Sequence, residues 1–158
     1  IRRHFDHRFA IGVAGFPEGH LLCPDLDQDA RVLKTKIDNG ADFVITQLFF
    51  DNQVYFQYTE RLRRLGVTAR IIPGILPITN YDSLLRFCAG CGTTVPTEVH
   101  ELFAPLRDDP DATLATGIQF TIRQCRDLLA GGAPGLHFYA LNKYQPVAEI
   151  WQAVRPAV

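Results

Sequence analysis

The amino-acid sequence predicts an α/β fold in which a parallel sheet is covered by helices, and three observations support this prediction. Short apolar segments alternate with longer segments that carry apolar residues at helical spacing. Turn signals rich in Gly, Pro and Asn separate the two kinds of segment. The apolar segments are continuous runs of Val, Ile, Leu and Phe, which is typical of strands in a parallel sheet.

The clearest of these strands lies within residues 41–51, ADFVITQLFFD. Side chains alternate along a strand, which puts Phe43, Ile45 and Gln47 on one face. Gln47 then lies near the carboxyl end of the strand, where α/β sheets bind their ligands. An amide without a partner would be costly in so apolar a run. We therefore predict that Gln47 contacts a ligand.

The remaining elements follow in order along the chain. Asp25 or Asp27 and, later, Asn80 are suited to cap helices, and Gly40 is suited to end one. Pro73 is expected near the end of its strand, because proline cannot donate to a ladder. We expect strands at 9–15 and 135–139, a strand with its loop at 70–77, and helices over about 25–38, 52–65, 80–88, 96–106, 110–129 and 145–154.

This plan amounts to four βα units with an extra helix after the third strand. A complete (βα)8 barrel needs eight strands and about 250 residues, so a chain of 158 residues supplies about half of one. Residues 1–158 are expected to be the C-terminal portion of a single (βα)8 TIM-barrel domain, or else a small open sheet. The chain contains no Met, which suggests a piece of something longer.

Composition argues against several classes of protein. Lys and Arg total 16 against 17 Asp and Glu, so no basic excess points to nucleic acid or an acidic membrane surface. No apolar run approaches the roughly 20 residues that span a bilayer. The four cysteines form no dense framework, which favours a reducing cytoplasm. Cys88 and Cys91 lack the second ligand pair of a zinc site, so no metal is expected.

Polar residues at the carboxyl ends of the strands are the first candidates for a site. They are His20, Gln47, Asn80, Asn142 and Lys143. His20 is equally consistent with a loop histidine bonded to backbone, and His137 alternates with apolar residues, as a core histidine does. No glycine-rich dinucleotide or phosphate loop is present. A phosphate would instead meet helix N-termini and Lys36.

Four blocks of the sequence resemble the methylenetetrahydrofolate reductase family. They are residues 13–20 (VAGFPEGH), 36–51 (KIDNGADFVITQLFFD), 71–77 (IIPGILP) and 135–143 (GLHFYALNK), in the family's order and spacing. The resemblance covers nearly the whole chain and corresponds to the second half of a flavin-binding barrel. It implies an FAD-dependent oxidoreductase that takes a hydride from NAD(P)H and reduces 5,10-methylenetetrahydrofolate to 5-methyltetrahydrofolate. It also implies a cytoplasmic homo-oligomer that serves one-carbon metabolism and methionine biosynthesis.

The resemblance implies roles for individual residues. The folate-binding positions are Gln47, which would also meet the nicotinamide, and Ser83, Phe87 and Lys143. The positions that line FAD are Phe16, His20, Cys23, Asp29, Val32, Thr35 and Lys36. Four of these positions depart from the family pattern. Position 83 carries Gln in some relatives and position 23 is Ala in several, while position 16 is usually Tyr and position 143 is usually Arg. A hydroxyl contact and a bidentate contact would therefore be lost.

The same resemblance implies that this chain contains no catalytic residue. The Glu that protonates the substrate and the Asp that tunes the flavin belong to the upstream half of the family's barrel. Residues 1–158 alone are therefore predicted to lack reductase activity and to bind FAD weakly or not at all. The alternative is a non-catalytic half-barrel that binds a partner or oligomerises through its open edges. A proline-oxidising FAD barrel is a weaker alternative, against which the four blocks argue.

Overall fold

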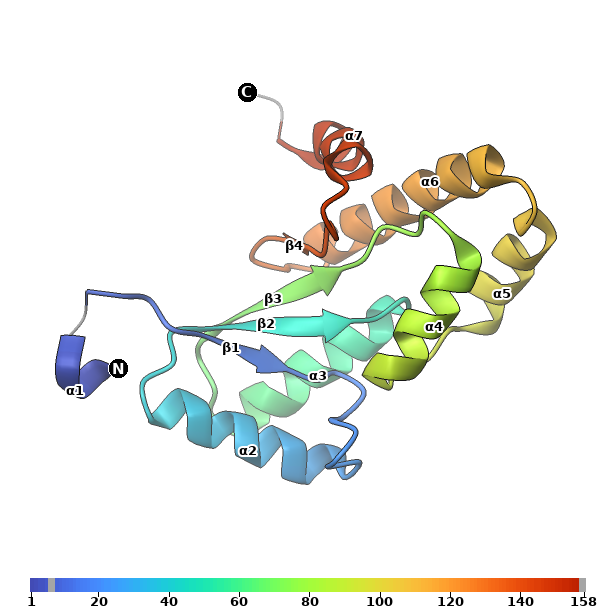
Figure 1. The fold of residues 1–158 in the computed structure, drawn as a ribbon. Coiled ribbons are helices and arrows are strands. Elements are labelled where there is room, and N and C mark those ends of the chain that lie inside the picture. Colours follow the sequence, from blue (N-terminus) through green and yellow to red (C-terminus); the bar gives the residue numbers. More distant parts are fainter. Residues whose placement is uncertain (6–7, 157–158) are drawn as a thin grey trace.

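A four-stranded parallel sheet forms the centre of the protein (Figure 1). The computed structural model describes residues 1–5 and 8–156. The strands lie in the order β1-β2-β3-β4, and each neighbouring pair is parallel. The predicted α/β fold with a parallel sheet is therefore confirmed. The strands are β1 (Gly12–Gly15), β2 (Phe43–Leu48), β3 (Arg70–Ile75) and β4 (His137–Phe138).

Helices connect the strands and pack mainly on one face of the sheet (Figure 1). Between β3 and β4 the chain forms three α-helices in succession, where a plain βα unit has one. The helices are α1 (Arg2–Phe5), α2 (Leu26–Asp38), α3 (Asn52–Arg64), α4 (Tyr81–Cys91), α5 (Thr97–Phe103), the 3-10 turn η1 (Ala104–Leu106), α6 (Pro110–Ala130) and α7 (Tyr144–Val154).

Side-chain caps fix where the main helices begin. Asp25 caps α2 by accepting hydrogen bonds from the backbone N–H groups of Asp27 and Gln28, at 2.9 and 3.0 Å. Of the two caps expected for this helix, Asp25 is therefore the one that the structure uses. The same role falls to Asp51 in α3, Asn80 in α4 and Asp109 in α6.

The face of the sheet that packs against the helices holds the main hydrophobic core. In β2 the side chains of Val44, Thr46 and Leu48 are buried, whereas the residues between them are only half-buried. Helices α2, α3, α6 and α7 supply the facing side chains, which include Ala30, Leu33, Tyr55, Tyr58, Leu62, Ile122, Cys125, Leu128 and Ile150. The helices are thus held by continuous apolar contact with one side of the sheet.

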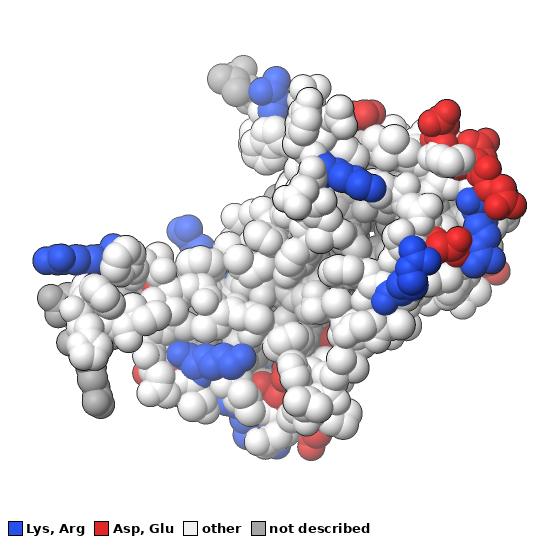
Figure 2. All heavy atoms as spheres, in the orientation of Figure 1, with Lys and Arg blue, Asp and Glu red and all other residues white. Residues whose placement is uncertain are grey.

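The opposite face of the sheet is left largely uncovered. Phe43, Ile45 and Gln47 of β2 and Ile72 of β3 alternate with the buried residues and are half-buried. The centre of this face carries few charged side chains (Figure 2). Within the described ranges, β1 and β4 each pair with a strand on one side only. Parallel sheets are normally covered on both faces, so this face has room for further structure or for a ligand.

A second apolar cluster lies beyond the carboxyl ends of β2 and β3. Leu48 and Leu76 pack there against residues of α4, α5 and α6, including Phe103 and Phe120. The buried Thr93 hydroxyl donates to the backbone O of Leu48 at 3.3 Å, which ties the turn after α4 to the end of β2. The cluster therefore holds α4 close to the end of the sheet where ligands are expected.

Both edge strands are shorter than the sequence predicts. β1 begins at Gly12 rather than at residue 9. Just before it, the Ile11 N–H donates to the Asp42 carboxylate at 2.6 Å, so a side chain takes the place of a ladder bond. β4 pairs over two residues only, and not over the whole of 135–139. Edge strands gain less from pairing than central ones, which explains why the apolar pattern overestimates their length.

Three positions inside the elements also differ from prediction. Helical spacing puts Leu129 on the apolar stripe of the helix over 110–129 and Val54 on that of the helix over 52–65. In the structure Leu128 is buried and Leu129 is 36% exposed, and in α3 Tyr55 is buried and Val54 is half-buried. Both differences are shifts of one residue, and an apolar pattern does not fix the phase of a helix more closely than that. Pro73 lies within β3 and not near its end.

Several features are absent from the described residues. None of their helices is long and apolar enough to cross a lipid bilayer. Their cysteines are free, with Cys88 and Cys125 buried. Across the same residues, no three His, Cys, Asp or Glu side chains gather in a way that could hold a metal ion.

Candidate functional site

The carboxyl end of β2 departs from regular pairing with β3. Three residue steps along β2, from Ile45 to Leu48, match two steps along β3, so β2 contains one extra residue. The bulge lies opposite Pro73, which has no N–H to donate. Beside it, the Gly74 N–H donates to the Thr46 Oγ1 at 2.9 Å. The Thr46 side-chain hydroxyl thus gives the Gly74 N–H an acceptor where the ladder is irregular, and the internal proline of β3 lies at this irregularity.

Tyr139, which follows β4, closes over this bulge. Its hydroxyl donates to the backbone O of Thr46 at 2.9 Å. A Cβ at Gly74 would lie 2.2 Å from the same oxygen and 2.7 Å from the Tyr139 ring, so no side chain fits there. Burial, with a smaller contribution from Cys91, raises the pKa of Tyr139. The phenol therefore keeps its proton and remains a donor.

Gln47 occupies the bulge and is half-buried. Its Oε1 accepts a hydrogen bond from the Leu48 N–H at 3.0 Å. Among the described residues its Nε2 donates to none, so the amide has a donor to offer. A small cavity beside it is lined by residues from three segments, including Phe16, Glu18 and Cys91. Bulges often aim a side chain at a functional site, and here the bulge presents Gln47 at the end of the sheet.

Four predicted residues gather between the end of β1 and helix α2, and we call them the β1–α2 cluster: Phe16, His20, Asp29 and Lys36. The Phe16 and His20 rings meet edge to face, with centroids 4.6 Å apart. The Lys36 Nζ lies 5.9 Å from the Phe16 ring centroid and donates to the Ala14 backbone O at 3.4 Å. The cluster therefore combines an aromatic surface with a cation at a strand end.

Asp29 is the buried carboxyl of the β1–α2 cluster, only 7% exposed. Burial raises the pKa of its carboxyl, and the charges of Lys36 and His20 together with the His20 backbone N–H oppose that effect. Asp29, Val32 and Lys36 are three and four residues apart on α2 and so share one side of the helix. The helix therefore presents a carboxylate, an apolar residue and an ammonium group in line.

The other predicted flavin residues lie at the margin of this cluster. Val32 is 42% exposed on α2. Thr35 is exposed, and its hydroxyl donates to the Arg31 backbone O at 3.0 Å. Cys23 is half-buried in a turn, where its N–H donates to the His20 backbone O at 2.7 Å. The structure thus unites four of the seven residues and leaves three around them.

The folate candidates gather on the other side of Gln47, in two adjoining cavities of about 110 and 230 Å3. Ser83 of α4 lines both cavities, Phe87 lines the smaller and Lys143 lines the larger. Ser83 is exposed, and its Oγ accepts a hydrogen bond from Arg86 at 3.1 Å. Three of the four predicted folate residues are therefore brought together.

The loop after β4 contributes residues that the sequence analysis did not assign to a site. Leu141 lines both cavities and is 56% exposed, and Tyr139 lines the larger one. Leu141 and Asn142 have φ angles of 45° and 63°, the only positive φ values of non-glycine residues in the described chain. Such a conformation is strained for Leu and is common at functional sites. No sequence signal marks a strained Leu, although the neighbouring Asn is typical of the left-handed region.

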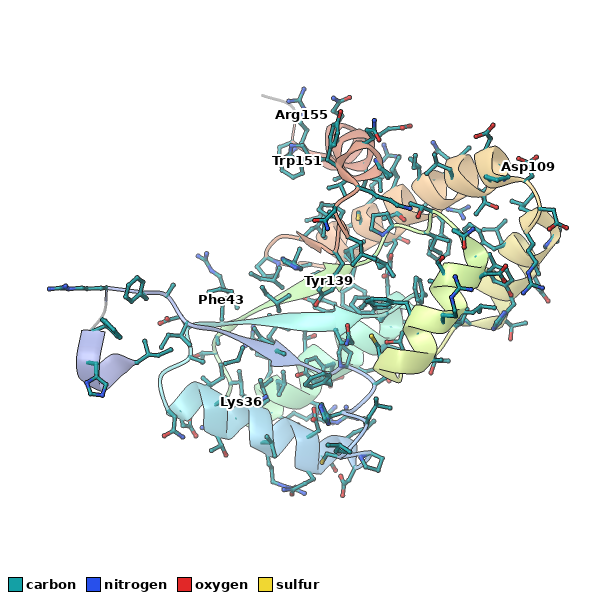
Figure 3. The ribbon with its side chains drawn as sticks, viewed as in Figure 1. Lys36, Phe43, Asp109, Tyr139, Trp151 and Arg155 are labelled. Atoms are coloured by element: carbon teal, nitrogen blue, oxygen red, sulfur yellow. The ribbon has the colours of Figure 1, made fainter. Side chains whose placement is uncertain are left out.

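Gln47 lies on β2, between the two groups of predicted residues. Figure 3 shows Lys36 on α2 and Tyr139 beyond β4, on opposite sides of β1 and β2. A cavity of about 570 Å3 lies elsewhere, between the start of α3 and helices α5 and α6. Its walls include Asn52, Arg123 and Asp127 and none of the predicted residues. We place the candidate site at the strand ends because the bulge, the strained loop and the buried carboxyl all lie there.

A solved structure shares the fold over nearly the whole chain. It is an uncharacterised protein from Clostridium thermocellum that binds two copies of 5-methyl-5,6,7,8-tetrahydrofolic acid. The TM-score is 0.62 at 17% sequence identity, with 96% of this chain and 55% of that chain covered. At this identity, the likeness establishes the fold alone.

Curated relatives match at higher identity. Methylenetetrahydrofolate reductase 1 of Schizosaccharomyces pombe is 37% identical over 150 residues, which cover 95% of this chain and 25% of the relative. Methylenetetrahydrofolate reductase (NADH) 1 of Arabidopsis thaliana is 38% identical over 151 residues, which cover 90% and 26%. The chain therefore spans about a quarter of the length of these relatives. The family model for methylenetetrahydrofolate reductase matches residues 1–155, and the chain belongs to the methylenetetrahydrofolate reductase family.

Proposed function

We propose that this chain is the C-terminal half of a (βα)8 barrel that reduces 5,10-methylenetetrahydrofolate to 5-methyltetrahydrofolate, with FAD as cofactor and NAD(P)H as hydride source. One observation carries the proposal: Gln47 is presented at the strand ends between two groups of residues, one suited to a nucleotide and one to a folate. The names of the curated relatives support the reaction, and the uncovered face of the sheet supports the need for a second half.

The β1–α2 cluster fits the adenosine and phosphate portions of FAD. The buried Asp29 carboxylate can accept hydrogen bonds from ribose hydroxyl groups. The Lys36 ammonium can neutralise a phosphate, and the Phe16 ring offers an apolar surface. Burial of the Asp29 carboxyl outweighs the favourable charges of Lys36 and His20, so hydrogen bonds from a ligand would stabilise the ionised carboxylate.

The cavities around Ser83 fit a folate. An aromatic ring at Phe87 can stack on a planar ring system, and the Lys143 ammonium can meet a glutamate carboxylate. The Gln47 amide has both a donor and an acceptor, which matches the mixed edge of a pterin. The same amide can also bind a nicotinamide carboxamide, so one side chain can serve two substrates in turn.

Hydride transfer in this reaction would be supplied by the bound flavin, and the residues of this chain would bind and orient the reactants. Glu18 and Asp51 are the carboxylates that directly follow β1 and β2 among the described residues, and the backbone engages both. The Glu18 carboxylate accepts the Thr94 N–H at 3.2 Å, and the Asp51 carboxylate caps α3 through the Gln53 N–H at 2.8 Å. The acid and the flavin-tuning carboxylate are therefore assigned to the upstream half.

A non-catalytic role is the second candidate, because both edge strands of the described sheet are open. The deciding experiment produces this chain alone and together with the upstream barrel half, which we call the reconstituted barrel. We expect the reconstituted barrel to retain FAD and to oxidise NAD(P)H when methylenetetrahydrofolate is supplied. If both pieces fold but the mixture remains colourless and inactive, the reductase proposal is wrong and the binding module takes its place.

Gln47→Ala in the reconstituted barrel tests the central residue. Removing one hydrogen-bonding group that contacts both substrates should lower kcat/KM by about 10–100-fold, with flavin content unchanged. Gln57→Ala, which truncates an exposed glutamine of α3, is the matched control and should leave kcat/KM unchanged. Equal activity of the two variants would show that Gln47 does not contact the substrates.

A further inference from the structure

Helix α3 buries two tyrosines that differ in one respect. Tyr55 and Tyr58 are 3% and 2% exposed. The Tyr55 hydroxyl donates to the Ile71 backbone O at 2.8 Å. The Tyr58 hydroxyl is fully buried and donates no hydrogen bond to any residue that the structure describes. A buried O–H without an acceptor destabilises a fold, so Phe would suit position 58 better unless the hydroxyl is used.

The Tyr58 hydroxyl lies against the β1–α2 cluster. A Cβ at Gly15 would lie 2.4 Å from the hydroxyl oxygen, which places that oxygen directly beside the end of β1. The backbone of Phe16 and the charge of the Asp29 carboxylate both act on it. Burial and the Asp29 charge raise the pKa of Tyr58 far above its ordinary value. Tyr58 therefore keeps its proton, and its O–H has no acceptor of its own among the described residues.

We propose that Tyr58 is a positioning residue for Asp29: its hydroxyl donates a hydrogen bond to the Asp29 carboxylate when the ribose of a bound dinucleotide engages that carboxylate. The inference rests on the proposed function, because it requires a dinucleotide in the β1–α2 cluster. A carboxylate accepts several hydrogen bonds at once. Donors on the protein side, from Tyr58 and from the His20 N–H, would leave the remaining lone pairs for ribose hydroxyl groups and would favour the ionised form.

The other charged groups around this pair remain in place when the hydroxyl is removed. His20 and Lys36 face Asp29. Arg61 faces Tyr58 from α3 and pairs with Asp27 at 3.2 Å. The change Tyr58→Phe deletes a single oxygen atom and leaves these groups untouched. A difference between Tyr58→Phe and the unmodified protein therefore reports on the hydroxyl.

The test measures binding of FAD and of FMN to the reconstituted barrel as a function of pH. FMN lacks the adenosine ribose and is therefore the matched ligand. Tyr58→Phe should weaken FAD binding by about 5–20-fold and leave FMN binding unchanged. Since Asp29 loses a donor, the loss of FAD binding on acidification should also move to higher pH. The control Tyr55→Phe should lower the urea midpoint and leave the ratio of FAD to FMN affinity unaltered.

A double-mutant cycle with Asp29→Asn completes the test. If Tyr58 acts through Asp29, removing the hydroxyl should have little further effect on FAD binding once Asp29 is replaced. Unchanged FAD binding in Tyr58→Phe, equal loss of FAD and FMN, or additive effects in the cycle would overturn the inference. Failure of the unmodified protein to bind flavin would overturn the proposed function, and this inference with it, so the two failures are distinguishable.

Discussion

The two faces of the sheet use the same strands in different ways. On the face toward the helices, Val44, Ile71 and Ile75 are at most 1% exposed. On the other face, Ile45 and Ile72, of equal size and in the same strands, are half-buried. The first face stabilises the fold, because the free energy gained from apolar residues scales with the area they remove from water. The second face contributes less to stability and leaves its side chains available for contacts outside this chain.

The largest expected effect tests this difference directly. Ile71→Ala should lower the free energy of unfolding by about 2–5 kcal/mol, because it creates a cavity in the core. Ile45→Ala should cost less than about 1 kcal/mol. Urea unfolding of the flavin-free chain measures both values. Equal losses in the two variants would mean that the faces do not differ in this way, and a larger loss for Ile45→Ala in the reconstituted barrel would show that the second half covers it.

On the less buried face, Gly74 is a position where no side chain is tolerated. Gly74→Ala should destabilise the protein by about 1–3 kcal/mol, because its Cβ would meet the Thr46 backbone O at 2.2 Å and backbone cannot move aside cheaply. Gly90→Ala is the control, since nothing lies within 4 Å of its Cβ and the position is helical. That substitution should stabilise by up to about 1 kcal/mol. Thermal unfolding of the two variants in parallel compares the shifts, and a stable Gly74→Ala would contradict the bulge geometry.

Asp29 adds a pH dependence to the comparison. Burial raises the pKa of its carboxyl above the ordinary value of 3.8, so the folded state holds this proton more tightly than the unfolded state. The tighter binding of this proton stabilises the folded state fully below pH 3.8, and the stabilisation is lost as the pH rises through the pKa of Asp29 in the folded state. At pH 7 Asp29→Asn should therefore be more stable than the unmodified chain. The difference in the free energy of unfolding between the two should become smaller as the pH falls toward 4. Urea midpoints over this range check the sign, and a gap that widens on acidification would exclude desolvation as the dominant effect.

The smallest effect is expected for an ion pair away from both faces. Lys34 and Asp38 pair on α2, with side chains 32% and 55% exposed. Solvent and salt screen such a pair, so Asp38→Asn should change the free energy of unfolding by about 0.5 kcal/mol or less. Chemical denaturation at low and high salt measures the difference. A loss of unfolding free energy comparable to that of Ile71→Ala would show that surface charge, and not burial, determines the size of these losses.

Much of the fold followed from patterns that act over a few residues. The apolar run of 43–48 and the cap at Asn80 depend on local spacing, and both appear in the structure where the sequence predicts them. Position 73 shows the limit of such patterns. The proline lies inside β3 beside the bulge of β2, where the Gly74 N–H pairs with the Thr46 hydroxyl of another strand, and pairing between strands is not encoded by the spacing within one strand.

In the candidate site, too, features set by local patterns were predicted and features set by contacts between distant residues were not. The placement of His20, Gln47 and Lys143 at strand ends followed from the order of strands and helices. The positions of the Tyr58 and Tyr139 hydroxyl groups did not, because each lies beside a residue far along the chain, Gly15 for Tyr58 and Thr46 for Tyr139. An aromatic residue at helical or strand spacing is typical of a core position. Only the position of the hydroxyl in the folded structure shows that a tyrosine could also act at the site.

The matching order of strands in the chain and in the sheet has a kinetic consequence. Each strand pairs with the next one to be synthesised, as Gly12 of β1 does with Phe43 of β2, so the connections closed from β1 to β2 and from β2 to β3 are shorter than that between β3 and β4. Short loops close fast and at low entropic cost. The sheet can therefore form progressively from β1 as the chain is translated. The slow step in folding is expected at the β3–β4 pairing, because α4, α5 and α6 must first form and pack before β4 can reach its neighbour.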